Sequence, residues 1–226
     1  MADRPLIVFD VNETLLDLET MTPTFERILG DRSAMRLWFM QLITYSQALT
    51  LADIYVPFTD IGAAILAMLG EARGIKIGEA DRRELTDRFA TMPPHAEVPG
   101  ALWRLKSESF RLFTLTNNTA AISRRQLAHA ELLDVFEQCF SVDESHRYKP
   151  APEAYAVVTR ALKVSAAMLY LVACHTWDTI GAVSAGWKAA FIKRTGNDAI
   201  DVLPEPHITV CHLNELADRL IASYKR

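Results

Sequence analysis

Short, wholly apolar runs separated by amphipathic segments occupy the start and the C-terminal half of the chain. The run Leu6–Phe9 is typical of a parallel strand covered on both faces. Further strands are expected at Phe110–Thr116, Phe140–Val142, Leu169–Ala173, Ala189–Ile192 and Ile208–Val210. Helices are expected at Ala101–Glu108, Ala120–Ala130, Pro152–Leu162, Thr179–Ala185 and Asn214–Ser223. This alternation predicts a parallel sheet with helices on both faces.

A different pattern fills residues 22–91, which read as mostly helical and contain no convincing strand. The expected helices are Thr22–Leu29, Ser33–Leu51 with Ser33 as its N-cap, one within residues 57–74, and Glu79–Ala90. The segment MPPHAEVPG, residues 92–100, is a cluster of helix breakers that marks a boundary. We therefore predict an α/β fold in which residues 1–16 and 97–226 form a Rossmann-like parallel-sheet core and residues 17–96 form an inserted α-helical cap.

The amino-acid composition of the chain argues against some classes of function and location. The 226 residues are 50% hydrophobic and 23% charged, which is typical of an ordinary globular protein. A formal net charge of -4 argues against nucleic acid as a partner. The three widely spaced cysteines match neither a disulfide framework nor a zinc motif, so we expect a reducing, cytoplasmic location. No signal peptide or membrane-spanning run is recognised, so no membrane association is expected.

Polar side chains directly follow four of the expected strands. In open α/β sheets, ligands bind at the carboxyl ends of the strands, near a topological switch point. Each such residue taken alone is explained as a helix cap or a turn former. The whole set at one edge of the sheet is better explained as a binding or catalytic site. Its members are Asp10, Asn12, Thr14, Thr116, Asn117, Asn118, Lys149, Cys174, His175 and Asp178.

These segments carry a resemblance to a known family. FDVNETLLDL, LTNNT, YKPAPEAY and VACHTWDTIGA, in this order, resemble the haloacid dehalogenase superfamily and, within it, the L-2-haloacid dehalogenases. The resemblance implies that Asp10 is a nucleophile that displaces halide from a 2-haloalkanoic acid and forms an aspartyl ester, which water then hydrolyses. It assigns Lys149 as the cation beside Asp10. It also assigns Asp178 to the organisation of Lys149 and the hydrolytic water.

The resemblance also implies a set of residues around the substrate. Thr14 matches a residue that hydrogen-bonds near the nucleophile, while Thr116 and Asn117 match the residues that hold the substrate carboxylate. Tyr155 matches a tyrosine beside the site, although the core face of a helix would explain it equally well. The full predicted substrate-binding set is Asn12, Thr14, Phe39, Thr116, Asn117, Tyr155 and Trp177. No cofactor and no metal are expected, and a homodimer is expected from the aromatic-rich helical surface.

Two positions depart from the family pattern. Phe39 occupies the place of an arginine that helps to receive the departing halide, and a phenyl ring offers neither a charge nor a donor. His175 replaces an amide that positions water, and a neutral imidazole can do this and also act as a general base. The neighbouring Cys174 is interpreted as a small buried apolar residue rather than a reactive thiol.

Two alternatives remain open. A magnesium-dependent phosphatase or phosphonatase-like hydrolase of the same superfamily carries a second aspartate where this chain has Asn12, and further acids where it has Ala173-Cys174-His175. Mg²⁺ prefers oxygen ligands and usually carboxylates, which speaks against this alternative. The other alternative is a weakly active homologue that binds a small carboxylate, and Phe39 is the reason for considering it.

Overall fold

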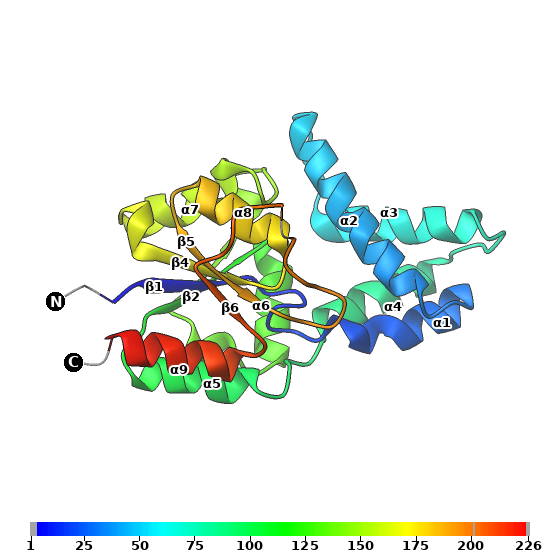
Figure 1. Cartoon of the computed structure of the whole chain (residues 1–226). Coiled ribbons are helices and arrows are strands. Elements are labelled where there is room, and N and C mark those ends of the chain that lie inside the picture. The colour runs from blue at the N-terminus through cyan, green and yellow to red at the C-terminus, as the bar shows by residue number, and fades with distance from the viewer. Residues whose placement is uncertain (1–3, 201, 225–226) are drawn as a thin grey trace.

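One parallel sheet organises the computed structural model, which describes residues 4–200 and 202–224 (Figure 1). Its strand order is β3-β2-β1-β4-β5-β6. The strands are β1 (Leu6–Phe9), β2 (Leu112–Thr116), β3 (Gln138–Ser141), β4 (Leu169–Ala173), β5 (Lys188–Ile192) and β6 (Ile208–Val210). The chain builds outward from β1 to β3 and then returns to place β4 on the other side of β1. The switch point of the sheet therefore lies beside β1, where a ligand site is expected.

Helices cover both faces of the sheet, as the alternating pattern predicts. Figure 1 shows α7 (Pro152–Leu162) and α8 (Thr176–Ser184) above the sheet and α5 (Val98–Ser107) and α9 (Leu213–Tyr224) below it. The helix α6 (Ala120–His129) packs against β3. Because β1, β2 and β4 are buried along their whole length, their sequences are apolar at nearly every position. The predicted α/β class is confirmed.

The inserted segment forms four helices beside the sheet, opposite the two chain ends in Figure 1. They are α1 (Thr22–Leu29), α2 (Ala34–Leu51), α3 (Phe58–Glu71) and α4 (Glu79–Ala90). The ring of Trp38 on α2 packs against Phe25 of α1 and Phe89 of α4, with centroids 5.2 and 5.7 Å away. This aromatic cluster packs α1, α2 and α4 against one another.

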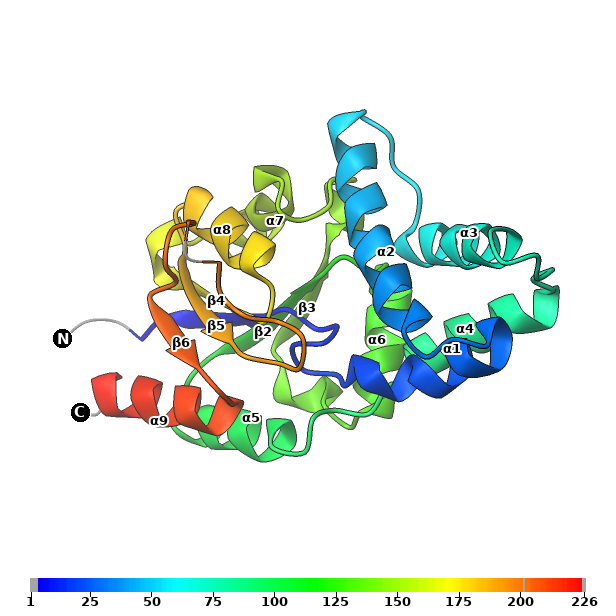
Figure 2. The same cartoon turned by 45° about the vertical axis from the view of Figure 1, so that its right-hand side comes forward.

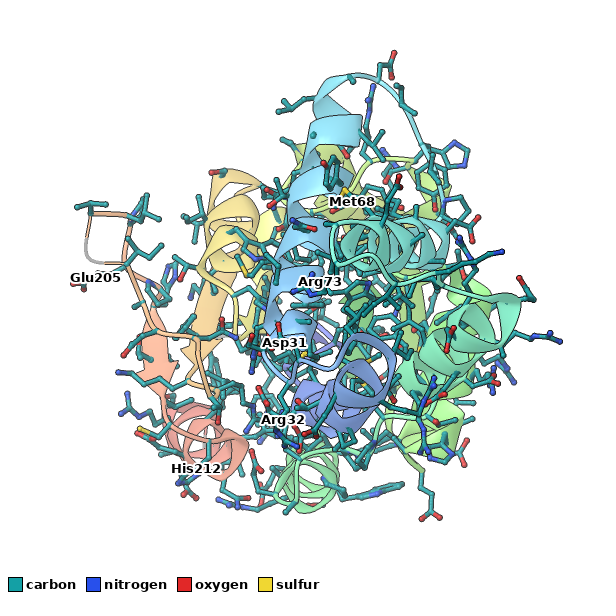
Figure 3. The ribbon with its side chains drawn as sticks, turned by 90° about the vertical axis from the view of Figure 1, so that its right-hand side faces the viewer. Asp31, Arg32, Met68, Arg73, Glu205 and His212 are labelled. Carbon is teal, nitrogen blue, oxygen red and sulfur yellow. The ribbon has the colours of Figure 1, made fainter. Side chains whose placement is uncertain are left out.

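The two segments that join these helices to the sheet lie side by side. Asp17 N donates to Pro93 O at 2.8 Å, and His95 N donates to Leu15 O at 3.0 Å. Figure 2 shows α2 extending from this region past the sheet edge. Figure 3 labels Asp31 and Arg73 of the inserted segment. They form an ion pair in which Arg73 Nη2 lies 3.2 Å from Asp31 Oδ2. The division into a core of residues 1–16 and 97–226 and a cap of residues 17–96 stays a prediction.

Several predicted boundaries shift. The helix expected at Thr179 begins at Thr176, because His175 already has extended geometry and stands in the N-cap position. The strand expected from Phe110 begins at Leu112, since Phe110 N still bonds to Leu105 O at the end of α5. Ser33 stands in the N-cap position of α2 as predicted, but its side chain makes no capping bond, because its hydroxyl donates to Asp31 Oδ1 at 2.6 Å.

Smaller differences are found elsewhere. The strand expected at Phe140–Val142 is Gln138–Ser141. Four short 3₁₀ turns, at Leu18–Met21, Leu133–Val135, Val142–Glu144 and Ala166–Met168, complete the secondary structure of the described residues. Within that same part of the chain, every helix is too short or too polar to cross a membrane.

Candidate active site

Asp10 lies at the carboxyl end of the central strand β1, where it is 4% exposed. Its Oδ1 accepts a hydrogen bond from Lys149 Nζ at 2.8 Å, and its Oδ2 accepts one from the Thr14 hydroxyl at 2.6 Å. Thr14 Oγ1 in turn accepts from Cys174 N at 3.0 Å, which ties the loop after β1 to the end of β4. Both carboxylate oxygens of Asp10 therefore have fixed donors.

Lys149 is fully buried, and all three of its ammonium protons have acceptors. Besides Asp10, Nζ donates to Asp178 Oδ2 at 2.6 Å and to Leu115 O at 3.1 Å. Burial disfavours the charged ammonium, but Asp10 and Asp178 outweigh this and raise the pKa of Lys149. The ammonium thus bridges the two carboxylates and remains protonated.

Burial also opposes ionisation of Asp10, yet the charge of Lys149 and the contacts with His175 hold the pKa of Asp10 well below its ordinary value. Asp178 behaves differently. Burial raises the pKa of Asp178 even though Lys149 acts in the opposite direction, and the charge of Asp10 adds to the rise. Of the two carboxyl groups that share one ammonium, Asp10 therefore has a lowered pKa and Asp178 a raised one.

Tyr155 lies behind Asp178, on the side away from Lys149. Its hydroxyl donates to Asp178 Oδ1 at 2.7 Å and also lies 3.0 Å from the Asp178 carbonyl oxygen. Gly181 makes this approach possible, because a Cβ atom there would lie 2.3 Å from the Tyr155 hydroxyl oxygen. The glycine in the segment TWDTIGA is therefore required by packing at the site.

Thr116 and Asn117 lie at the end of β2, next to Lys149. Asn117 Oδ1 accepts from Lys149 N at 3.1 Å, and its Nδ2 is buried without a hydrogen-bond partner among the described residues. Thr116 Oγ1 accepts from Asn118 N at 3.1 Å. A buried amide donor without a partner is costly, and a bound ligand with an acceptor would satisfy it.

His175 approaches Asp10 from the end of β4. Its Nδ1 lies 3.6 Å from Asp10 Oδ2, and its Nε2 donates to Glu13 Oε2 at 2.8 Å. The imidazole is stacked on Trp177 with a centroid distance of 4.9 Å and lies 5.9 Å from the Phe39 ring. Burial opposes a charge on this ring, but Cys174, Asp10 and Glu13 beside it raise the pKa of His175 well above its ordinary value.

Asn12 is close to the site in sequence, but its side-chain oxygen is bonded elsewhere. It accepts from Gln126 Nε2 at 3.0 Å and from Asn118 Nδ2 at 3.3 Å. Gln126 also donates to Phe89 O at 2.8 Å, at the end of α4. Asn12 thus joins β1 to α6 and to the helical segment, and its predicted contact with substrate stays a prediction.

Sequence reasoning did not identify Glu13 or Arg36. Glu13 is a buried carboxylate in the turn after Asp10, and Arg36 of α2 forms an ion pair with it. Arg36 stands three positions before Phe39, which places both on one face of the helix. That helix spacing was the available signal for Arg36, whereas Glu13, three residues after Asp10, resembles an ordinary polar turn residue.

Three buried residues offer ligand atoms for a metal ion within 4.8 Å of one another, namely Glu13, Cys174 and His175. The Cys174 sulfur is nearly equidistant from the two ring nitrogens, at 3.7 and 3.6 Å, and is therefore not aligned with one lone pair. Both Glu13 oxygens are already engaged, by His175 and Arg36. Burial raises the pKa of the Cys174 thiol, which disfavours the thiolate that a metal needs. The residues do not fit a metal as they stand.

A magnesium ion does not fit between Asp10 and Asp178 either, because Lys149 Nζ occupies that position and binds one oxygen of each. The site is thus a carboxylate held by an internal ammonium at the switch point of a parallel sheet.

The sequence matches the haloacid dehalogenase-like hydrolase family over residues 7–192, and the chain belongs to that family. It is 27% identical to (S)-2-haloacid dehalogenase 2 of Pseudomonas sp. strain CBS-3, over 95% of this chain and 94% of the relative. It is 26% identical to haloacetate dehalogenase H-2 of Moraxella sp. strain B, over 90% and 92%. The fold matches L-2-haloacid dehalogenase from Xanthobacter autotrophicus with covalently bound chloropropionic acid, at a TM-score of 0.90 and 21% identity, over 99% of this chain and 100% of that one.

Proposed function

We propose that this chain is a hydrolytic dehalogenase that converts small 2-haloalkanoic acids into 2-hydroxy acids and halide through an ester at Asp10. The single observation that carries the proposal is the 2.8 Å contact between the buried Lys149 ammonium and Asp10, which keeps the nucleophile ionised without a metal. The relatives named as (S)-2-haloacid and haloacetate dehalogenases support the same activity.

In the first step, an Asp10 carboxylate oxygen attacks the carbon that bears the halogen. The new bond forms between that oxygen and the carbon, the carbon–halogen bond breaks, and its electron pair leaves with the halide. Lys149 balances the charge of Asp10 before the attack. The unpartnered Asn117 Nδ2 and the Thr116 hydroxyl supply donors for the substrate carboxylate.

In the second step, water hydrolyses the ester at Asp10 Cγ. His175 is the proposed base for this water, because its Nδ1 lies 3.6 Å from Asp10 Oδ2 and is held in place between Trp177 and Phe39. Asp178 keeps Lys149 directed at Asp10 during both steps. An oxygen of Asp10 leaves with the product as its hydroxyl group, and an oxygen from water replaces it in the carboxylate.

The second candidate is a weakly active homologue that binds a small carboxylate. Phe39 favours it, because this apolar ring is 3% exposed and stands where the family pattern has a cation for the departing halide. Magnesium-dependent phosphatase activity is disfavoured by Asn12 and by the position of Lys149. A cytoplasmic location and a homodimer through α2 also stay proposals. The dimer is supported by Leu37, Met40 and Tyr45, which are 43, 57 and 46% exposed.

Halide release from L-2-chloropropionate and from chloro-, bromo- and fluoroacetate tests the proposal. Turnover in ¹⁸O-water should place the label in Asp10, detectable by mass spectrometry of the peptide that contains it. The variant Asp10→Asn should lose turnover, because an amide is a poor nucleophile. Absence of halide release from all four acids, together with Mg²⁺-dependent cleavage of a phosphate ester, would contradict the proposal.

A further inference from the structure

Glu13 is an unusual residue for its position. It is 3% exposed and has φ 64°, a left-handed conformation that non-glycine residues rarely adopt. A buried carboxylate with strained backbone persists only where the surrounding contacts hold it in place. The two side-chain oxygens face Arg36 and His175, and the backbone oxygen accepts from His95 Nε2 at 2.9 Å. Strain of this kind is concentrated at functional sites, so the contacts of Glu13 need an explanation.

The contact with His175 determines which ring nitrogen carries the proton. A carboxylate oxygen 2.8 Å from Nε2 can only accept, so Nε2 must be protonated. In the neutral imidazole this leaves the lone pair on Nδ1, the nitrogen that faces Asp10. The rings of Trp177 and Phe39 limit rotation of the imidazole. The orientation of His175, and its tautomer whenever the ring is neutral, are thus both set by its neighbours.

We propose that Glu13 is a positioning residue for ester hydrolysis, which holds the proton of His175 on Nε2 so that Nδ1 accepts a proton from the attacking water. This inference rests on the proposed function. The water oxygen bonds to Asp10 Cγ while its proton moves to Nδ1, and the bond between Cγ and the ester oxygen then breaks. The imidazolium returns the proton to that oxygen, and the product leaves as a 2-hydroxy acid.

Arg36, on α2 of the inserted helices, binds the Glu13 carboxylate that contacts His175. It binds Glu13 and Glu19, and its Nη2 also donates to Thr195 O at 2.8 Å. Burial opposes ionisation of Glu13, but His175 and Arg36 outweigh it and lower the pKa of Glu13. Glu13 is therefore an ionised acceptor for the imidazole. Because Arg36 lies on α2, the cap contributes to the hydrolytic half of the reaction through Glu13.

Charged and titratable groups from several segments surround the contact between Glu13 and His175. They are Asp10 from the loop after β1, Arg36 from α2, Lys149 from the loop before α7, and Cys174 at the end of β4. Ester formation removes the negative charge of Asp10 and leaves Glu13 as the carboxylate beside His175. Glu13 is therefore the group that keeps the base oriented at the stage where hydrolysis needs it.

The variant Glu13→Gln separates the two chemical steps. With L-2-chloropropionate we expect a burst of halide equal to the amount of enzyme, followed by steady-state turnover reduced at least about tenfold, since general-base catalysis contributes about 10²–10⁴. The ester should accumulate and appear in the intact mass of the protein. Glu19→Gln is the matched control: it removes another carboxylate bound by Arg36 that has no contact with His175 and should retain normal turnover.

A second variant covers the case in which Glu13→Gln does not fold. Asparagine tolerates the left-handed conformation but is too short to reach His175, so Glu13→Asn should fold and show the same burst. The ¹⁵N NMR signals of the His175 ring should report a protonated Nε2 in the unmodified enzyme and a changed tautomer population in both variants. A role of Glu13 in folding alone would leave those signals unchanged.

The outcomes separate this inference from the proposed function. Absence of halide release by the unmodified enzyme overturns both. Normal ester hydrolysis in either Glu13 variant, or loss of the halide burst itself, overturns the inference alone. Stoichiometric zinc in the purified protein, with activity lost on its removal, would assign Glu13, Cys174 and His175 to a metal instead and would likewise overturn it.

Discussion

The two sides of Asp10 are built in different ways. On the Oδ1 side, Lys149, Asp178 and Tyr155 are all 0% exposed, belong to the sheet core, and satisfy one another's hydrogen bonds. On the Oδ2 side, His175 depends on Glu13, and Glu13 depends on Arg36 from the inserted helices. Arg36 is partly open to solvent, with a side chain 32% exposed.

This difference indicates that the two sides of Asp10 contribute to different steps of the proposed mechanism. The Oδ1 side fixes the charge of the nucleophile and does not depend on the cap. On the Oδ2 side, His175 is proposed to activate the hydrolytic water, and it depends on Glu13 from the loop after β1 and on Arg36 from the inserted helices. The departures from the family pattern, Phe39 and His175, both fall on this second side. We expect substitutions on the first side to stop halide release and those on the second side to slow ester hydrolysis.

Lys149→Met should have the largest effect. It removes the ammonium that bridges Asp10 and Asp178, so buried Asp178 loses its cation and Asp10 keeps only its contact with His175. Breaking a buried ion pair in this way costs about 3–5 kcal/mol of stability, and the single-turnover rate of halide release should fall by at least about 10³. Urea denaturation and rapid-quench halide measurements check the two effects.

The control for this prediction is Lys193→Met. Lys193 forms an ion pair with Asp198 at the surface, where its side chain is 43% exposed. A solvent-screened surface pair contributes little to stability, so stability and halide release should change little. Equal effects of the two substitutions would show that the buried ammonium has no special role.

His175→Asn should have an intermediate effect, and it tests the other side. An amide can position water but cannot accept its proton, so ester hydrolysis should slow by about 10² while the halide burst remains. Since neutral His175 is the proposed base, hydrolysis in the unmodified enzyme should decline as the pH falls through the pKa of His175 in the ester, where Cys174 and Glu13 still raise that pKa but the charge of Asp10 is gone. The asparagine variant should lose this decline, which a stopped-flow pH series measures. An unchanged pH profile would exclude His175 as the base.

Tyr155→Phe should have a smaller effect, because it removes a hydrogen bond and no charge. The loss of the donor to Asp178 should cost about 1–2 kcal/mol of stability and reduce turnover by a factor of roughly ten or less. Tyr148→Phe is a matched control, since the hydroxyl of Tyr148 bonds to Val56 O rather than to Asp178. It should lower stability similarly and leave turnover unchanged. Equal turnover in the two variants would contradict a role of Tyr155 at the site.

The Oδ1 side could be predicted from the sequence, whereas the Oδ2 side could be predicted only in part. Asp10, Asn117 and Asp178 follow apolar strands, and the carboxyl ends of parallel strands meet at one edge. Glu13 and Arg36 are 23 positions apart and resemble a polar turn residue and a solvent-facing helix residue. Their contact depends on how α2 packs against the loop after β1. Local patterns do not report such packing.

The smallest expected effect is that of metal chelation, and it tests both sides at once. On the Oδ1 side, Lys149 Nζ already bridges Asp10 and Asp178, at 2.8 and 2.6 Å, so a divalent cation would have to displace a buried ammonium. On the Oδ2 side, Glu13 is bound by Arg36 and His175, and no acid follows β4 until Asp178. Halide release after dialysis against EDTA should therefore equal that of the untreated enzyme, and added Mg²⁺ or Zn²⁺ should not increase it. Activity that is lost with EDTA and restored by Mg²⁺ would contradict the assignment of Lys149 as the cation of the site. Restoration by Zn²⁺ alone would instead revise the Oδ2 side, because sulfur and imidazole are ligands that zinc prefers and magnesium does not.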